Sequence, residues 1–156
     1  MPPAMLTVAL ALALSLPSPG VLVPHQSLAG VHLRDTPTAV RARVGKGYTV
    51  CKGCDRPTWF YFSKSLESGL GVTFRNNRVA AVYTLGSPPG WRTSHGLRIG
   101  QGTERVATLY GATKMSGCIG YQARSVRRTT SVTTIYSIES YVSGFALTLP
   151  SEPVCR

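Results

Sequence analysis

The sequence predicts a small α+β domain in which two repeats each pack a short helix on an antiparallel β-sheet. Three observations lead to this fold class. A chain of 156 residues with 43% hydrophobic and 15% charged residues can build one core and carries too little charge for disorder. Its 16 glycines and 11 prolines favour short elements joined by turns. The third observation is a pattern that recurs along the chain.

The recurring pattern consists of two segments that match at a constant offset of 66 residues. In each segment a threonine, Thr36 or Thr103, can cap a helix of about eight residues, and a glycine can end it. Pro37 suits the first turn of the first helix. The sequence therefore predicts two repeats, residues 30–85 and 96–149. The matched positions are Gly30 and Gly96, Leu33 and Ile99, Val40 and Val106, and Gly45 and Gly111.

Strand patterns follow each predicted helix. Residues 58–62 form an aromatic run, and alternating residues on both sides of Arg75-Asn-Asn-Arg78 predict a hairpin. A second hairpin is predicted from residues 131–138 and 141–149. Period two assigns one face of each hairpin to the core. The core-facing set is Leu70, Val72, Phe74, Val79, Ala81, Tyr83, Leu85, Phe145, Leu147 and Leu149; the opposite set is Thr73, Ala80, Val82, Thr84, Thr133, Ile135, Ala146 and Thr148.

The first 29 residues predict an export signal. No Lys, Arg, Asp or Glu occurs before residue 31, and the apolar run Leu6–Leu16 is too short to span a bilayer. We interpret residues 1–29 as a signal peptide with a short leader, cleaved between residues 20 and 29. The mature protein is then one secreted domain, residues 30–156, without a transmembrane anchor; a place in the cell envelope stays open. The alternative, a buried N-terminal helix, conflicts with the prolines at its end.

Four cysteines in an exported chain predict two disulfides. Three pairings are open, and we expect Cys51–Cys54 and Cys118–Cys155, since the last strand should return beside Cys118. The Cys51-Lys-Gly-Cys54 spacing also occurs in redox and zinc sites. A redox motif should open a helix, and a zinc site needs a second pair of ligands, which the three histidines do not supply. We therefore expect structural disulfides and no metal.

No catalytic apparatus is visible in the sequence. The six acidic residues fall mostly at predicted turns and helix starts, and the glycine-rich stretch 96–102 lacks the Gly-Lys-Ser/Thr of a phosphate loop. We expect no enzyme and no cofactor. The net charge of +11 instead favours anionic partners, although scattered surface arginine explains it equally well.

Two binding hypotheses follow, and a structural role in the envelope is a third. The first is a protein partner on the exposed sheet face, centred on Trp59 and Tyr61, with Trp91 and Tyr121 nearby. It assumes that Phe60 and Phe62 point to the core; the alternative is that Trp59 and Trp91 are core residues. The second is an anionic envelope polymer, bound through a set of arginines. These are Arg124, Arg127 and Arg128, with Arg75 and Arg78 at the hairpin tip.

Three stretches carry a family resemblance: residues 30–45, 71–79 and 96–111. In these stretches a helix ended by glycine is followed, after a gap, by an Arg-Val strand, and the unit is repeated behind a signal peptide. This arrangement resembles the tandem-repeat fold of β-lactamase-inhibitor-like proteins. The same unit occurs singly in BamE-type lipoproteins, and the chain also resembles small secreted actinobacterial proteins of unknown function. The resemblance implies two helices on one sheet with a free face for a protein. It transfers no target and no inhibitory activity.

Overall fold

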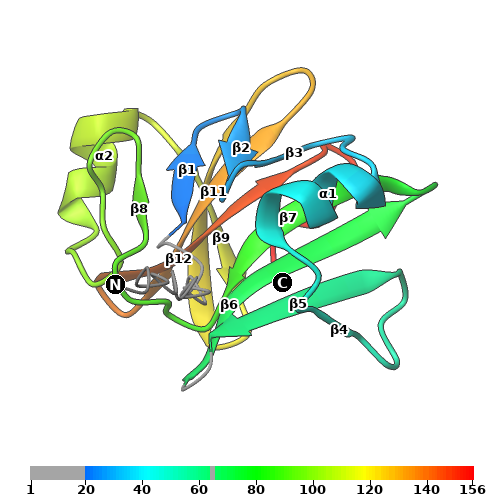
Figure 1. Ribbon diagram of the computed structural model, residues 1–156. Helices are drawn as coiled ribbons and strands as arrows, with labels where there is room; N and C mark the ends of the chain where they lie inside the picture. Colours follow the sequence, from blue (N-terminus) through cyan, green and yellow to red (C-terminus); the bar gives the residue numbers. More distant parts are fainter. Residues whose placement is uncertain (1–19, 64–65) are drawn as a thin grey trace, which may run out of the picture.

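The computed structural model describes residues 20–63 and 66–156, and its largest element is a strongly twisted eight-stranded sheet (Figure 1). Neighbouring strands are antiparallel and lie in the order β4-β5-β6-β7-β12-β11-β10-β9. Both halves of the sheet therefore order their four strands in the same way, outward from the central β7–β12 pair. The strands are β4 (Thr49–Val50), β5 (Thr58–Ser63), β6 (Leu66–Arg75), β7 (Arg78–Leu85), β9 (Lys114–Cys118), β10 (Tyr121–Arg127), β11 (Val132–Ile138) and β12 (Tyr141–Thr148).

A small second sheet and two short helices complete the fold, which is mostly β. Helix α1 (Pro37–Val44) packs over the first half of the large sheet, whereas α2 (Glu104–Tyr110) stands beside β8 (Figure 1). The second sheet has the order β3-β2-β1-β8. Its strands are β1 (Val21–Val23), β2 (Ser27–Leu28), β3 (Val31–His32) and β8 (Arg92–Thr93). No helix among the described residues has the length and apolar character needed to cross a membrane.

The helix ends follow the sequence pattern with one exception. The Thr36 hydroxyl accepts a hydrogen bond from the Ala39 N–H at 3.1 Å, so Thr36 caps α1 as predicted. Gly45 and Gly111 end the two helices with φ angles of 103° and 67°, which favour glycine. Thr103 does not cap α2, because its backbone is helical (φ −71°, ψ −14°) and its hydroxyl reaches no cap N–H. The prediction for Thr103 is therefore wrong.

The predicted orientation of β5 is also wrong. Trp59 and Tyr61 are 8% and 7% exposed and belong to the main core, whereas Phe62 on the opposite face is 47% exposed. The reason is the register on β6: Trp59 lies opposite Val72, and Tyr61 lies opposite Leu70. Directly opposite residues of neighbouring strands share a face, so the aromatic pair must join these core residues.

A β-bulge reverses the predicted faces of β7. Thr73 pairs with Ala81, but the next residue, Phe74, pairs with Val79, so Ala80 is an extra residue in the ladder. Beyond the bulge Val82 joins the main core, and Tyr83 packs on the cluster of the opposite face. The predicted inward orientation of Ala81, Tyr83 and Leu85 is therefore wrong. In the second half Phe145 and Leu147 face the core as predicted, and Ile135, predicted outside, joins them because it lies opposite Phe145.

The described fold begins earlier than the predicted boundary at residue 30. Strands β1 and β2 pair with each other, and Leu22 and Leu28 are fully buried in the core. Gly20 lies so close to the Trp91 ring that a Cβ there would approach it to 2.5 Å. Residues 20–29 thus belong to the domain, whereas the predicted signal segment up to residue 19 lies outside the described residues.

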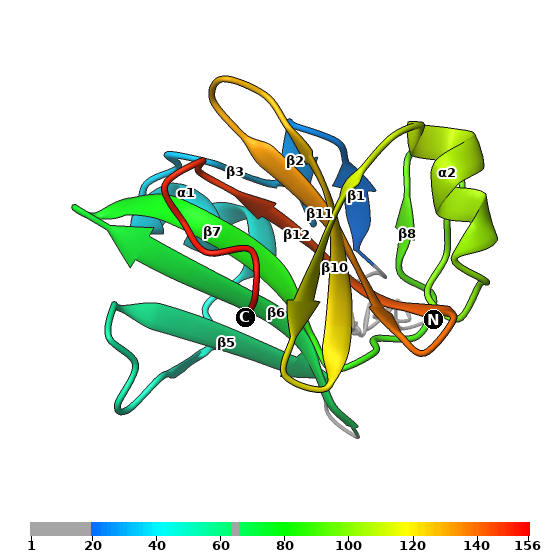
Figure 2. The ribbon, with the colours of Figure 1, turned by 180° about the vertical axis from the view of Figure 1, so that it is seen from behind.

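The C-terminal segment crosses the face of the large sheet opposite α1 (Figure 2). We call this the outer face; its apolar cluster consists of Ala123, Tyr136 and Ala146, with partly buried neighbours that include Tyr83 and Tyr121. The predicted disulfide pairing is confirmed. Cys118 and Cys155 join the segment to β9 with a Cα–Cα distance of 5.6 Å, and Cys51 and Cys54 form a local bridge at 5.8 Å.

Candidate functional site

A stack of aromatic rings joins α1 to β5. The Tyr48 and Trp59 rings are nearly parallel with centroids 3.9 Å apart, and the Phe74 ring meets Trp59 edge-on at 4.7 Å. The Arg41 guanidinium lies 4.8 Å from the Trp59 ring centre, a cation–π distance. Tyr61 donates its hydroxyl to the Gly45 carbonyl at 3.1 Å. Its burial, and then its neighbour Tyr48, raise the pKa of Tyr61 to about 12.

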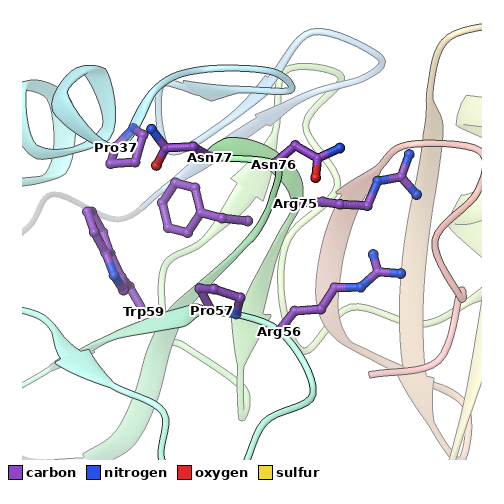
Figure 3. A pocket seen from close by; sticks show the side chains of 8 residues that line it. Pro37, Arg56, Pro57, Trp59, Arg75, Asn76 and Asn77 are labelled. Atoms are coloured by element: carbon purple, nitrogen blue, oxygen red, sulfur yellow. The ribbon is translucent and has the colours of Figure 1, made fainter.

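A hollow of about 270 Å³ opens on one side of this stack, next to the start of α1 (Figure 3). Trp59, Pro37 and Pro57 wall it, and the two asparagines of the β6–β7 turn stand at its rim. Arg56 and Arg75 line the side that faces the C-terminal segment, and their guanidinium groups point toward that segment (Figure 3). The complete lining is Pro37, Arg56, Pro57, Trp59, Phe74, Arg75, Asn76 and Asn77.

A second, more open hollow of about 600 Å³ lies along α1 on the Tyr48 side of the stack. Thr38, Arg41, Ala42, Lys46 and Tyr48 line it. Because Tyr48 stacks on Trp59, the two hollows flank one rigid aromatic pair. Each hollow carries two cationic side chains, and no carboxylate lines either of them. We call the two hollows with the stack between them the basic face.

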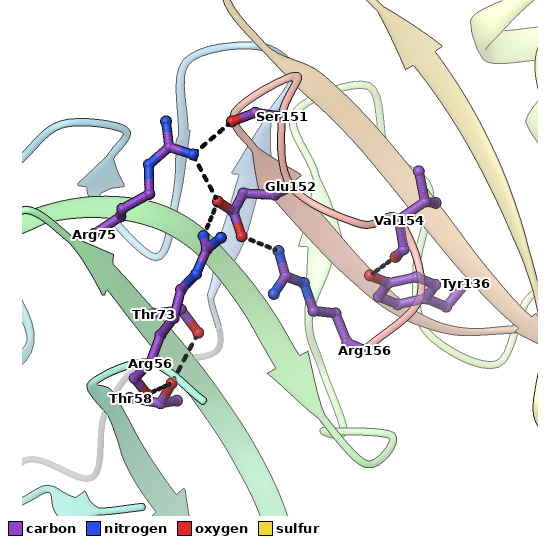
Figure 4. A network of polar contacts seen from close by, with 9 residues as sticks. All are labelled: Arg56, Thr58, Thr73, Arg75, Tyr136, Ser151, Glu152, Val154 and Arg156. Atoms are coloured by element: carbon purple, nitrogen blue, oxygen red, sulfur yellow. Dashed lines mark hydrogen bonds and ion pairs between the residues drawn. The ribbon is translucent and has the colours of Figure 1, made fainter. Parts of the chain in front are cut away.

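One buried carboxylate holds the arginines of the first hollow in place (Figure 4). The side chain of Glu152, only 2% exposed, contacts Arg56 directly, and its oxygens lie 3.7 Å from Arg75 and from Arg156. Three guanidinium groups therefore share a single negative charge, and the cluster keeps a formal excess of two positive charges. Because the side chain is buried and contacts three guanidinium groups, it fixes these arginines in space.

The C-terminal segment extends the cluster to the second half. Arg75 donates to the Ser151 hydroxyl at 3.1 Å, and Arg127 donates to the Pro150 carbonyl at 3.0 Å. Two arginines from different halves of the sheet, on β6 and β10, thus bind consecutive residues of one segment. Tyr136 holds the same segment by donating to the Val154 carbonyl at 2.7 Å.

The predicted aromatic site does not form an exposed patch. Trp59, Tyr61 and Trp91 are all buried, at 9% exposure or less, which overturns the expectation that the first two are substantially exposed. Trp91 packs at the start of β1 next to Gly20. Tyr121 lies on the outer face, where its ring meets Tyr136 edge-on at 5.4 Å.

The predicted arginines divide into separate groups. Arg75 and Arg127 meet at the C-terminal segment, whereas Arg78 donates to the Arg34 carbonyl at 3.5 Å. Arg124 donates to the Ser137 hydroxyl at 2.9 Å on the opposite side of β10 from β9. Arg128 is exposed after the end of β10. The pKa of His25 is lowered first by the burial of its ring and then by the positive charge of Arg128.

Sequence reasoning missed Arg41, Lys46, Tyr48, Arg56 and Glu152. A signal for the first two was present: residues 36–54 contain four basic residues and no Asp or Glu. Nothing in the sequence connects Arg56 with Glu152, because 96 residues separate them. Among the described residues, no group of three or more His, Cys, Asp or Glu side chains is placed to hold a metal ion.

Comparison with known proteins gives one structural likeness. No family model matches the chain, and no curated protein matches it in sequence. The fold is similar to that of an extracellular protein containing a SCP domain from Bacillus anthracis str. Ames, with a TM-score of 0.57 and 11% identity. The match covers 76% of this chain and 44% of that protein, so this chain spans less than half its length. At this identity the likeness extends to the fold alone.

This match corrects the family resemblance drawn from the sequence. The solved structure that the chain resembles is an extracellular protein containing a SCP domain, instead of the β-lactamase-inhibitor-like or BamE-type protein that the motifs suggested. The motifs that suggested those families were helix-ending glycines and short alternating strands. Such motifs record local backbone requirements, which unrelated α+β proteins share, and they therefore carry little information about a family.

Proposed function

We propose that this domain is an exported, non-enzymatic binding module that holds an anionic polymer on its basic face. One observation carries the proposal: four cationic side chains and no carboxylate line the hollows on the two sides of the Trp59–Tyr48 stack, and the single Glu152 beside the first hollow is outnumbered by its three arginine partners. A protein partner centred on Trp59 and Tyr61 loses its basis, because both side chains are buried.

The basic face suits a polymer better than a small ion. Its cations are Arg56 and Arg75 in one hollow and Arg41 and Lys46 in the other, so they flank a rigid stack instead of converging on one point. A chain with regularly spaced carboxylate, sulfate or phosphate groups can contact both hollows at once. The net charge of +11 adds a long-range attraction that raises the rate of encounter.

Export is supported by the covalent structure. Two disulfides bridge all four cysteines, which is the usual state of proteins outside the reducing cytosol. We propose that residues 1–19 are the signal segment and that cleavage falls near Gly20. Cleavage at residue 29 would remove β1 and β2 together with the buried Leu22 and Leu28.

We also infer that the two halves are copies of one unit. Each half has a helix ended by glycine and followed by four strands, and the strand order is the same on both sides of the β7–β12 pair. The offset of 66 residues relates both the helix-ending glycines and the buried Val40 and Val106. Superposing β5–β7 on β10–β12 would test this inference, and strands that do not overlay would contradict it. The helices have diverged in position, since α1 lies over the sheet and α2 stands beside β8 (Figure 1).

Binding to heparin, used as a model polyanion, tests the proposed function. We expect the purified, disulfide-intact protein to bind labelled heparin with an affinity that falls steeply as salt rises. The double variant Lys46→Gln/Arg75→Gln, with one change in each hollow, should bind about tenfold more weakly at physiological salt. Fluorescence anisotropy at several salt concentrations measures both effects.

The matched control is Arg92→Gln/Arg98→Gln, which removes the same charge from exposed positions away from the basic face. We expect it to weaken binding by less than about threefold, because only the long-range field changes. Equal losses in the two double variants would show that net charge alone attracts heparin, and the proposed face would be wrong. Circular dichroism melting confirms that each variant is folded.

A further inference from the structure

Strand β9 forms one edge of the large sheet, and its ladder phase shows which backbone groups face outward. Beyond the β10–β11 pair, Arg128 N–H donates to the Ser131 carbonyl at 2.8 Å. Hydrogen-bonded pairs alternate along an antiparallel ladder, so even-numbered residues of β10 bond to β11 and odd-numbered residues bond to β9. Their partners on β9 are Lys114, Ser116 and Cys118. Met115 and Gly117 therefore point their N–H and C=O groups away from the sheet.

These outward groups form an open edge within the described part of the chain. Cys155 Sγ lies 3.7 Å from the Gly117 carbonyl oxygen and covers that corner. The Met115 N–H, the Met115 C=O and the Gly117 N–H have no hydrogen-bond partner among the described residues. Unpaired groups of this kind are a template for one more strand.

The opposite edge of the sheet is closed to such pairing. Strand β4 has only two residues, and Cys51 N–H already donates to the Thr58 carbonyl at 2.8 Å. By the same alternation only Val50 presents outward groups, and the Cys51–Cys54 disulfide ends the strand directly after it. Short length and a covalent turn are ordinary means of protecting an edge. Strand β9 has five residues, no proline and a single lysine.

The side chains on the open edge indicate the chemistry of a partner. Met115 is 56% exposed, and Ile119 in the turn after β9 is fully exposed. Lys114 is exposed at this edge, and residues 105–138 contain no Asp or Glu. A second copy of this chain would bring its own lysine and its own excess positive charge to the same edge. The edge is therefore complementary to an extended segment that is both apolar and acidic.

We propose that β9 is a docking edge for an extended segment of a partner protein in which apolar and acidic residues alternate. The partner residue opposite Met115 would share its side of the sheet and be apolar, and its neighbour opposite Lys114 would be acidic. Main-chain hydrogen bonds to Met115 and Gly117 would supply the affinity, as in other cases of strand addition. This proposal is independent of the anionic polymer on the basic face.

The test uses a synthetic peptide of alternating valine and glutamate and the purified, disulfide-intact protein labelled with nitrogen-15. We expect the peptide to slow hydrogen exchange of the Met115 and Gly117 amides and to shift their resonances. A peptide with lysine in place of glutamate should bind about tenfold more weakly. In the variant Met115→Pro the outward N–H is removed without loss of a β9–β10 bond, so the fold should persist while peptide binding is lost.

The contrasting variant Ser116→Pro removes a bond to β10 and should lower the melting temperature, which checks the ladder phase itself. Unchanged Met115 and Gly117 amides at saturating peptide concentrations would overturn the proposal. So would equal binding of the lysine peptide, or peptide shifts at Thr49 and Val50 instead. Concentration-dependent protection of both amides without peptide would assign the edge to a second copy of this chain and overturn the acidic partner.

Discussion

The two halves of the large sheet have the same strand order but differ in what covers them. In the first half α1 lies over aromatic rings, and the basic hollows remain open on both sides of the Tyr48–Trp59 stack. In the second half α2 stands aside near β8 (Figure 1). There the aliphatic side chains of Ile135 and Leu147 fill the core around Phe145. The same topology therefore supports a rigid, open surface in one half and a plainer core in the other.

The outer face shows the opposite contrast. In the second half Tyr121 and Tyr136 lie on the outer face, and the C-terminal segment covers this face (Figure 2). The Cys118–Cys155 disulfide joins the segment to β9. Toward the first half the same segment supplies Glu152 and the Ser151 hydroxyl, which hold Arg56 and Arg75 at the margin of a hollow (Figure 4). The segment thus closes one half and organises the charge of the other. The following predictions test this division.

The largest expected effect is at Trp59. Replacing it with Ala removes a buried ring that contacts Tyr48, Phe74 and the Arg41 guanidinium. We expect the free energy of unfolding to fall by about 5 kcal/mol, the upper end for a large aromatic truncation. Denaturant unfolding measures it. Phe62→Ala on the other face of β5, where the side chain is 47% exposed, should cost about 1 kcal/mol or less.

A similar small loss at both positions would show that the stack is not part of the core. Trp59 would then be a surface residue available to a ligand, and the first half would have no aromatic core. A large loss at Phe62 would indicate instead that the outer face of the first half is covered in solution.

Residues 58–62 illustrate where sequence reasoning succeeds and fails. Alternating and β-branched residues predict the strands, and the turn Arg75–Arg78 predicts the β6–β7 hairpin correctly. Alternation alone does not say which face of β5 is inside, because both faces carry aromatic residues. The answer depends on the pairing of Trp59 with Val72, a contact between strands that the sequence pattern does not encode.

The bulge at Ala80 and the ion cluster at Glu152 also depend on contacts that the sequence pattern does not reveal. One inserted residue reverses the faces of β7, and no residue type in Val79-Ala-Ala-Val82 marks the insertion. Glu152 meets Arg56 across 96 residues of chain, so its role depends on the finished fold. The helices, by contrast, end at the predicted glycines because a positive φ is a local requirement.

The two disulfides should differ in their contribution to stability. Cys118–Cys155 spans 37 residues, whereas Cys51–Cys54 spans three. Loop-closure entropy gives a loss of about 4 kcal/mol for Cys118→Ser/Cys155→Ser and about 2 kcal/mol for Cys51→Ser/Cys54→Ser. Denaturant unfolding of both double variants measures the difference. Equal losses would mean that the C-terminal segment stays ordered through Tyr136 and Glu152 without its covalent link.

The smallest expected effect is an alkaline loss of stability with one contribution from each half. Burial raises the pKa of Tyr61 from its ordinary value of 10.0 to about 12, and burial also raises the pKa of Tyr136. Above pH 10 the unfolded chain releases these protons while the folded chain retains them, so stability must fall as pH rises from about 10 to 12. Denaturant unfolding at pH 8 to 12, with brief exposure to base, measures the slope.

The variants Tyr61→Phe and Tyr136→Phe separate the two contributions. Each variant removes one titrating hydroxyl and should therefore make the alkaline slope shallower. The Tyr61 hydroxyl donates a hydrogen bond to the Gly45 carbonyl, and the Tyr136 hydroxyl donates one to the Val154 carbonyl. At pH 8 each also loses one hydrogen bond, worth about 1 kcal/mol. Because the neighbouring Tyr48 also raises the pKa of Tyr61, removing the Tyr48 hydroxyl should reduce that pKa shift. An alkaline slope that Tyr61→Phe leaves unchanged would mean that water reaches the Tyr61 hydroxyl beneath α1, and the burial of Tyr61 below the aromatic stack would be wrong.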